Sequence, residues 1–296
     1  MKKTKKWGLL CIFTLCIMAG LCFVRPMKAE AASFQTTSLE SGQKKIGGTY
    51  FWKKNGKIYA SKSKKGAGKV IAEPGGWGNI VTNGSVVYYS QLSPNAAYGY
   101  VYSVKTSGKD RKRIAKVKDL YQIAAYYNGN LYISYGLIGP DMSTYRLNVK
   151  TKKGKKIGKE LVVYDQYKQY LLLHHATYMS REGGIRNNAY IYNCKTGKSV
   201  KISNKVVSGL NFSSGKVYYA EKINAKSVRI KSCSLTGKNK KTLVKKLSAN
   251  RYNIGKITSK YVYYWADSKG KQQYYRYDIK KKKAKKISLN TYIKEA

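Results

Sequence analysis

Residues 101–114 read VYSVKTSGKDRKRI, a short apolar strand pattern followed by a glycine-containing turn and a basic strand. The same succession returns in five further copies along the chain, of which the first is the least regular. These copies are IYASKSKKGAGKVI (58–71), YRLNVKTKKGKKI (145–157), IYNCKTGKSVKI (191–202), IKSCSLTGKNKKTL (230–243) and YRYDIKKKKAKKI (275–287). Such repetition indicates a fold that is built from equivalent structural units.

One apolar residue in each basic strand measures the length of the repeat. It falls at Ile71, Ile114, Ile157, Ile202, Leu243 and Ile287, at intervals of 43, 43, 45, 41 and 44 residues. Such a period is typical of a four-stranded propeller blade. We therefore predict an all-β fold, a six-bladed β-propeller of four-stranded antiparallel blades after an N-terminal signal peptide. No segment beyond that peptide carries a sustained helical period.

Turn residues and tyrosines define the remaining strands of each blade. Asn83-Gly84, Asn128-Gly129 and Ser214-Gly215 suit a tight hairpin turn, because these residues tolerate positive φ angles. A tyrosine-rich strand follows each turn, and the tyrosine pairs in these strands are predicted to lie in the core. With 29 Tyr and only 4 Pro, the whole composition favours strands.

The first blade has the weakest pattern. We expect its strands at 34–40, 46–52, 57–62 and 68–72. An alternative takes Asn55-Gly56 as the first turn and leaves the blade one strand short. In either case, closure of the propeller depends on the N-terminal segment.

The N-terminus has the pattern of a secretory signal. A basic MKKTKK precedes the apolar stretch WGLLCIFTLCIMAGLCFV (7–24), and Ala29-Glu30-Ala31 offers small residues for cleavage. We predict a signal peptide at 1–31, a single propeller domain at 32–296, and a location outside the cell or at its surface. The apolar stretch is also long enough for an uncleaved membrane anchor, so that alternative stays open.

The last blade carries a motif of a known family. Tyr264-Trp265-Ala266-Asp267 resembles the Tyr-Trp-Thr-Asp box of the low-density-lipoprotein-receptor type of six-bladed β-propeller. SLTGKNKKTL (234–243) and SVKTSGKDRKRI (103–114) stand where that family has its strand-connecting turn. The chain also resembles TolB-like propellers and secreted propellers of Gram-positive bacteria, over about 34–290. The resemblance implies a propeller that presents interaction surfaces.

Positive charge dominates the chain. Lys and Arg number 59 against 13 acidic residues, a formal net charge of +46. Without the predicted signal peptide, 53 basic and 12 acidic residues remain, and 32 of the basic ones fall in the six hairpins between third and fourth strands. Some of these lysines protect exposed strand edges from pairing with other chains. So large an excess also predicts an anionic partner.

The predicted binding residues lie in four of these hairpins, and we call them the basic rim. They are Lys109, Arg111, Lys112, Arg113, Lys152, Lys153, Lys155, Lys156, Lys238, Lys240, Lys241, Lys281, Lys282, Lys283 and Lys285. Lysine favours phosphate or sugar carboxylate over base-specific contacts, which suit arginine. We expect the partner to be an anionic polysaccharide, a teichoic acid or an acidic protein, and we do not expect sequence-specific binding of nucleic acid. The protein itself is expected to be a monomer.

A second candidate surface is the loop after the fourth blade's second strand. It follows His174 and His175 and carries Tyr178, Arg181, Glu182 and Arg186. As loops on rigid scaffolds often bind partners, the alternative function is a protein–protein interaction module, and the plain alternative is an ordinary exposed loop. Neighbouring residues on a strand point to opposite faces, so the two histidines do not suit one metal ion.

Catalytic motifs do not emerge from the sequence. We predict no catalytic residue, cofactor or metal, and keep an enzyme acting on an acidic glycan, through Asp119, Asp165 and Glu182, as a further alternative. Cys194 and Cys233 remain after loss of the signal peptide. Both occupy an apolar slot of the repeat and are predicted to be buried free thiols, with a disulfide as the alternative.

Overall fold

The computed structural model describes residues 33–39, 42–74, 79–94, 97–136, 142–158, 160–175, 188–224, 226–248, 252–268 and 271–295. The predicted signal peptide lies outside this range, so its cleavage stays a prediction. All the elements below lie in one compact unit, 34–296. Among the described residues, no helix has the length and apolar character of a membrane span.

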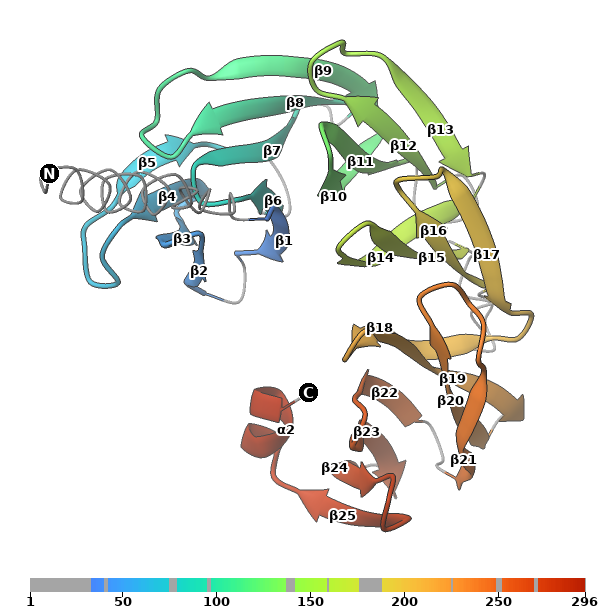
Figure 1. The fold of residues 1–296 in the computed structure, drawn as a ribbon. Coiled ribbons are helices and arrows are strands. Elements are labelled where there is room, and N and C mark those ends of the chain that lie inside the picture. The colour runs from blue at the N-terminus through green and yellow to red at the C-terminus, as the bar shows by residue number, and fades with distance from the viewer. Residues whose placement is uncertain are drawn as a thin grey trace, which may run out of the picture. The chain divides into compact units, whose positions relative to one another are not determined.

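Six antiparallel sheets make up this unit, one for each predicted blade (Figure 1). Blade one holds β2 (Lys44–Ile46), β3 (Thr49–Lys54), β4 (Lys57–Ser61) and β5 (Lys69–Ala72). Blade two holds β1 (Gln35–Ser38), β6 (Asn79–Thr82), β7 (Val86–Leu92), β8 (Tyr98–Lys105) and β9 (Lys112–Lys118). Blade three holds β10 (Leu120–Tyr127), β11 (Asn130–Tyr135), β12 (Ser143–Asn148) and β13 (Gly154–Gly158).

The remaining blades repeat the same order of strands. Blade four holds β14 (Leu161–Tyr167), β15 (Tyr170–His175), β16 (Ala189–Asn193) and β17 (Lys198–Ser203). Blade five holds β18 (Val207–Ser213), β19 (Lys216–Asn224), β20 (Ser227–Ser234) and β21 (Lys241–Ser248). Blade six holds β22 (Tyr252–Ile257), β23 (Tyr261–Ser268), β24 (Lys271–Asp278) and β25 (Lys283–Ile287). The chain is a six-bladed all-β propeller, as the sequence predicts.

The repeat length is confirmed, and so are two of the three predicted tight turns. At Asn83-Gly84 only Gly84 has a positive φ, of 88°, and the connection spans 83–85. Asn128 and Gly129 have φ angles of 41° and 76°, and Ser214 and Gly215 have 49° and 68°, the two successive positive values of a tight hairpin turn. Lys168 takes the same conformation in blade four, at φ 53°, where no Asn-Gly pair signals the turn. All six apolar residues that measured the repeat lie on the fourth strands β5, β9, β13, β17, β21 and β25.

The predicted strands of blade one are partly wrong. Strand β1, expected as its first strand, pairs antiparallel with β6 and is a fifth strand of blade two. Blade one begins instead with β2, and Asn55-Gly56 forms the turn between its second and third strands. The blade is therefore complete, with all four strands between Lys44 and Ala72.

Packing explains why β1 leaves the first blade. The ring of Phe34, just before β1, lies 4.0 Å from the Tyr126 ring of blade three and 5.6 Å from the Tyr88 ring of blade two. The Thr36 hydroxyl donates a hydrogen bond of 2.9 Å to the Ala124 carbonyl of blade three. These contacts with two later blades hold β1 beside β6.

Side chains on the first strands join neighbouring blades, whose first strands contact one another from β6 to β22. The Gln166 amide donates to the Tyr126 carbonyl at 2.7 Å and accepts from its N–H at 3.2 Å, which joins blade four to blade three. Asn211 makes the same pair of bonds with Ile257, at 2.7 and 3.1 Å, and joins blade five to blade six. We call Gln166, Asn211 and Asp165, described below, the seam.

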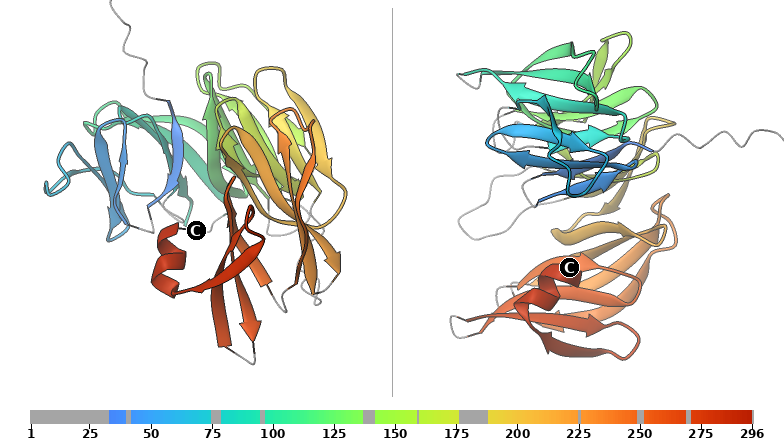
Figure 2. Two further views of the ribbon diagram at one scale, coloured as in Figure 1. Left: turned by 60° about the horizontal axis from the view of Figure 1, so that its bottom comes forward. Right: turned by 90° about the vertical axis from the view of Figure 1, so that its left-hand side faces the viewer.

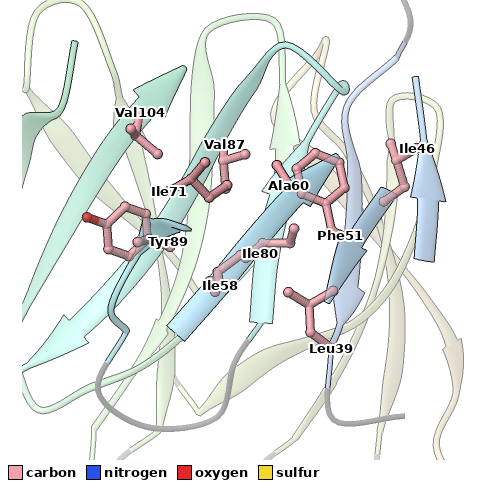
Figure 3. Close-up of a cluster of buried hydrophobic side chains, with 11 residues drawn as sticks. Leu39, Ile46, Phe51, Ile58, Ala60, Ile71, Ile80, Val87, Tyr89 and Val104 are labelled. Atoms are coloured by element: carbon pink, nitrogen blue, oxygen red, sulfur yellow. The ribbon is translucent and has the colours of Figure 1, made fainter. Parts of the chain in front are cut away.

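Apolar side chains fill the spaces between the sheets. Figure 3 shows one cluster, in which Phe51 and Ile58 of blade one meet Ile80, Val87 and Tyr89 of blade two. The tyrosine pairs are core residues as predicted. Those that are buried are Tyr88, Tyr89, Tyr218, Tyr219, Tyr263 and Tyr264.

Both cysteines are buried free thiols, as predicted. The Cys194 N–H donates to the Gln169 carbonyl at 2.8 Å, and the Val149 N–H makes the equivalent bond in blade three at 2.9 Å. Cys194 therefore occupies the slot that the repeat assigns to it. Burial raises the pKa of each thiol to about 11, which keeps Cys194 and Cys233 protonated and unreactive at neutral pH.

A short C-terminal helix, α2 (Leu289–Glu295), is not predicted by the sequence pattern. The Ser288 hydroxyl accepts a hydrogen bond from the Thr291 N–H at 3.1 Å, as an N-cap residue does. The helix contacts β24, where the Tyr292 and Tyr274 rings lie 4.9 Å apart. Figure 2 shows the helix beside the last blade. It thereby covers part of the last blade.

Candidate functional site

The basic rim lies on the hairpins between third and fourth strands, as predicted. All fifteen of its side chains are exposed. Eight of the rim residues lie in the turns just before the fourth strands. These are Lys109 and Arg111 before β9, Lys152 and Lys153 before β13, Lys238 and Lys240 before β21, and Lys281 and Lys282 before β25. The other seven lie on the fourth strands themselves. The fourth strand is the last strand in the hydrogen-bonded order of every sheet, so these cations line the sheet edges (Figure 1).

Local hydrogen bonds fix the backbone of the rim turns. The Asn148 side-chain oxygen accepts from the Lys150 and Thr151 N–H groups at 3.0 and 2.9 Å. The Asp278 carboxylate accepts from the Lys281 N–H at 2.8 Å. Such bonds are typical of Asx turns. The lysine side chains therefore project from an ordered backbone.

Two rim lysines occupy a backbone conformation that favours glycine. The equivalent turn position is glycine in three other blades, at Gly108 (φ 76°), Gly197 (φ 70°) and Gly237 (φ 75°). In blades three and six it is Lys152 (φ 57°) and Lys282 (φ 54°). A side chain with a Cβ atom costs about 1 kcal/mol there. The chain thus carries lysine where glycine fits better.

No carboxylate among the described residues forms an ion pair with a rim cation. Among the described residues, the ion pairs are those of Lys57 with Glu73, Lys105 with Asp110, Lys231 and Arg229 with Glu221, His175 with Glu160, and Arg276 with Glu295. None of them includes a residue of the basic rim. Unpaired, exposed cations leave a strong positive field that a polyanion can neutralise.

Blade two adds aromatic rings to the rim, which the sequence analysis did not identify. Tyr98, Tyr100 and Tyr102 alternate along β8, and a cation from the β9 side of the hairpin lies near each ring. Arg111, Arg113 and Lys116 supply these cations. We call these six residues the tyrosine–cation ladder. The alternation YGYVY was visible in the sequence, but the cations depend on how β9 is registered against β8, with a bulge between Val101 and Tyr102.

The predicted second surface is described only in part. Tyr178, Arg181, Glu182 and Arg186 lie outside the described residues. The His174 ring is packed edge-on against the Tyr164 ring at 5.5 Å, and burial lowers its pKa below the usual value. His175 instead approaches Glu160, with Nδ1 3.4 Å from the carboxylate. The two histidines thus have separate partners, and the described residues contain no cluster of three or more groups that suits a metal ion.

A cavity of about 550 Å³ lies between blades four and five. Its described lining comprises Asn188, Asn204, Lys205, Val206, Lys222, Ile223 and Asn224. These residues come from the start of β16, the connection between β17 and β18, and the end of β19. Sequence reasoning missed them, since three distant segments supply the lining and none carries a motif.

Asp119, Asp165 and Glu182, the acidic residues of the enzymatic alternative, lie far apart in the sequence, and the described ones have different surroundings. The Asp165 carboxylate accepts from the Gln166 N–H at 2.7 Å and from the Phe212 N–H of blade five at 3.2 Å. Burial raises its pKa. Asp119 lies in the turn between β9 and β10 with a φ of 50°, and Glu182 lies outside the described residues. Through these bonds Asp165 joins blade four to blade five. Gln166 joins blades three and four in the same way, and Asn211 joins blades five and six.

Comparison with known proteins supports the fold at low sequence identity. No protein-family model matches the chain, and no curated protein matches it in sequence. A prolyl endopeptidase structure matches 97% of this chain and 48% of its own, with a TM-score of 0.58 and 13% identity. The acylaminoacyl peptidase of Pyrococcus horikoshii matches 83% of this chain and 44% of its own, with a TM-score of 0.53 and 11% identity.

These peptidases share the propeller fold with this chain, which spans about half of their length. TolB from Acinetobacter baumannii also matches, at 11% identity over 86% of this chain and 69% of its own, but its TM-score of 0.40 carries no argument. The likeness therefore shows a β-propeller. Membership of the TolB-like or Tyr-Trp-Thr-Asp family stays a prediction.

Proposed function

We propose that this protein is a non-enzymatic propeller, secreted or held at the cell surface, that binds an anionic cell-envelope polymer through the basic rim. The observation that carries the proposal is that all fifteen rim cations are exposed and that, among the described residues, none forms an ion pair. A polymer with phosphate or carboxylate groups would displace bound counterions along these edges, which drives association.

Protection of strand edges does not account for the whole charge. A few lysines per edge suffice to prevent pairing, and mixed charges keep a protein soluble without strong self-repulsion. Here basic residues outnumber acidic ones by 59 to 13. Lys152 and Lys282 also support a role for the charge, because they occupy positive-φ positions where glycine would be less strained. Binding of a polyanion would account for the charge that edge protection leaves unexplained.

The test compares polymers and one variant of the purified protein. We expect binding to poly(glycerol phosphate) and alginate and none to neutral dextran. Replacing the fifteen rim residues by glutamine should abolish binding to both anionic polymers, while thermal unfolding shows that the variant is still folded. If it does not fold, the same changes made one hairpin at a time should lower affinity step by step. Unchanged polymer binding by folded variants would overturn the proposal.

A further inference from the structure

We propose that the tyrosine–cation ladder of blade two, which shares Arg111 and Arg113 with the basic rim, contacts the sugar or polyol units of the polymer, an inference that rests on the proposed function. The ligand is an anionic sugar or polyol polymer, called a glycan-type polymer below, whose charge comes from carboxylate or phosphate groups. The remaining rim would attract the polymer through charge alone.

The ladder repeats one pair of groups along two strands. The Lys116 Nζ lies 3.8 Å from the centre of the Tyr98 ring, the Arg113 guanidinium 5.7 Å from Tyr100, and the Arg111 guanidinium 4.3 Å from Tyr102. Alternate residues on a strand are about 7 Å apart, so the three pairs form a row. Arg111 also donates to the Gln91 side-chain oxygen at 2.8 Å. The rings and Gln91 hold the cations in place.

The short strands of blade one leave this row open to solvent. Strands β4 and β5 have 5 and 4 residues, whereas β8 and β9 have 8 and 7. The core cluster between the two blades includes Val104 and touches Tyr102, at one end of β8, but not Tyr98 at the other. The Tyr98 side chain remains 38% exposed. A ligand can therefore reach the rings and the cations together.

Blade six has a similar pair that is already neutralised. The Arg276 guanidinium lies 4.8 Å from the centre of the Tyr261 ring, and its Nη1 also lies 3.0 Å from a carboxylate oxygen of Glu295 in α2. Among the described residues, no carboxylate forms an ion pair with Arg111, Arg113 or Lys116. The positive charge of the ladder is thus available to an external anion.

The arrangement suits a glycan better than nucleobases. A base that stacks on an aromatic side chain needs an open ring face. Here the Tyr102 ring is stacked on the Tyr89 ring, with centres 5.4 Å apart, and Arg111 lies over it. The exposed Arg111, Arg113 and Lys116 supply a row of N–H donors beside the rings, which suits carboxylate, phosphate and hydroxyl groups. A second copy of this strongly basic chain would be repelled.

The test compares two triple variants that remove equal charge. One carries Arg111→Gln, Arg113→Gln and Lys116→Gln in the ladder, and the matched control carries Lys152→Gln, Lys153→Gln and Lys155→Gln in blade three. Affinity is measured for alginate, poly(glycerol phosphate) and single-stranded oligo(dT) at one salt concentration. We expect the ladder variant to lose at least about tenfold more affinity for the two glycan-type polymers than the control loses, because hydrogen bonds to charged groups are lost as well as charge.

A single change at an exposed ring checks the result without altering charge. Tyr98→Ser should weaken binding of alginate or poly(glycerol phosphate) several-fold and leave thermal unfolding close to that of the parent. Equal losses in the two triple variants would overturn the ladder while leaving the proposed function in place. An equal or larger loss for oligo(dT) would overturn the choice of a glycan. Full affinity in both triple variants would contradict the proposed function itself.

Discussion

The seam and the basic rim use polar side chains in opposite ways. On the first strands, Gln166 and Asn211 each form hydrogen bonds with both the N–H and the carbonyl of one residue in the neighbouring blade. On the fourth strands and their turns, the rim cations are exposed and lack carboxylate partners among the described residues. The difference teaches that the seam should determine stability and the rim should determine binding.

The largest expected effect on stability comes from breaking the seam. Asn211→Ala removes both hydrogen bonds to the buried Ile257, whose N–H and carbonyl then lose this partner, and a third bond to the Phe212 carbonyl. We expect the free energy of unfolding to fall by about 2–4 kcal/mol, measured by denaturant titration. Asn204→Ala, at an exposed position, is the control and should change stability little. Loss of polymer binding by folded Asn211→Ala protein would contradict the division of roles.

A smaller effect is expected at the strained lysines of the rim. Lys282→Gly relieves a φ of 54° and should raise the free energy of unfolding by about 0.5 kcal/mol, because the strain removed slightly exceeds the added entropy of the unfolded chain. Lys283→Gly, one residue later on β25, is the matched control and should destabilise the protein. Both changes remove one charge and should weaken polymer binding alike. A loss of stability in Lys282→Gly would show that strain does not matter there.

Mildly acidic pH should lower the stability of the fold without weakening polymer binding by the basic rim. Burial lowers the pKa of His174 below its usual value near 6.5, so the folded state favours the neutral ring. Its contribution to stability is complete above pH 6.5 and is lost as the pH falls through the lower, folded pKa. His174→Gln should reduce this loss, as followed by thermal unfolding between pH 7 and 5. His174 is not a residue of the basic rim, so polymer binding by folded protein should hardly change.

Sequence repetition predicts most of the fold, because each blade repeats its own turn and strand signals locally. The Asn-Gly turns, the apolar residues of the fourth strands and the slot of Cys194 all depend on neighbours within one blade. Strand β1 could not be placed, since its position depends on Phe34 and Thr36 meeting blades two and three far along the chain. Helix α2 is too short to show a period, although Ser288 marks its start.

Part of the candidate site could be predicted from the sequence and part could not. The rim residues could be named from the sequence, because a basic run after a turn stays exposed on an edge strand. The ladder could not, because its pairs depend on strand register and on how little of blade two the short blade one covers. The seam was missed for a related reason. Gln166 and Asn211 look like ordinary polar strand residues until a neighbouring blade supplies their partners.

The most direct measurement is the salt dependence of binding to poly(glycerol phosphate). It is made side by side on the parent protein, the Asn211→Ala variant and the rim variant with fifteen glutamines. We predict one steep loss of affinity with salt for the first two proteins and a shallow one for the rim variant, because counterion release scales with the number of cations that meet the polymer. An equally steep loss in the folded rim variant would contradict the claim that the rim is the binding surface.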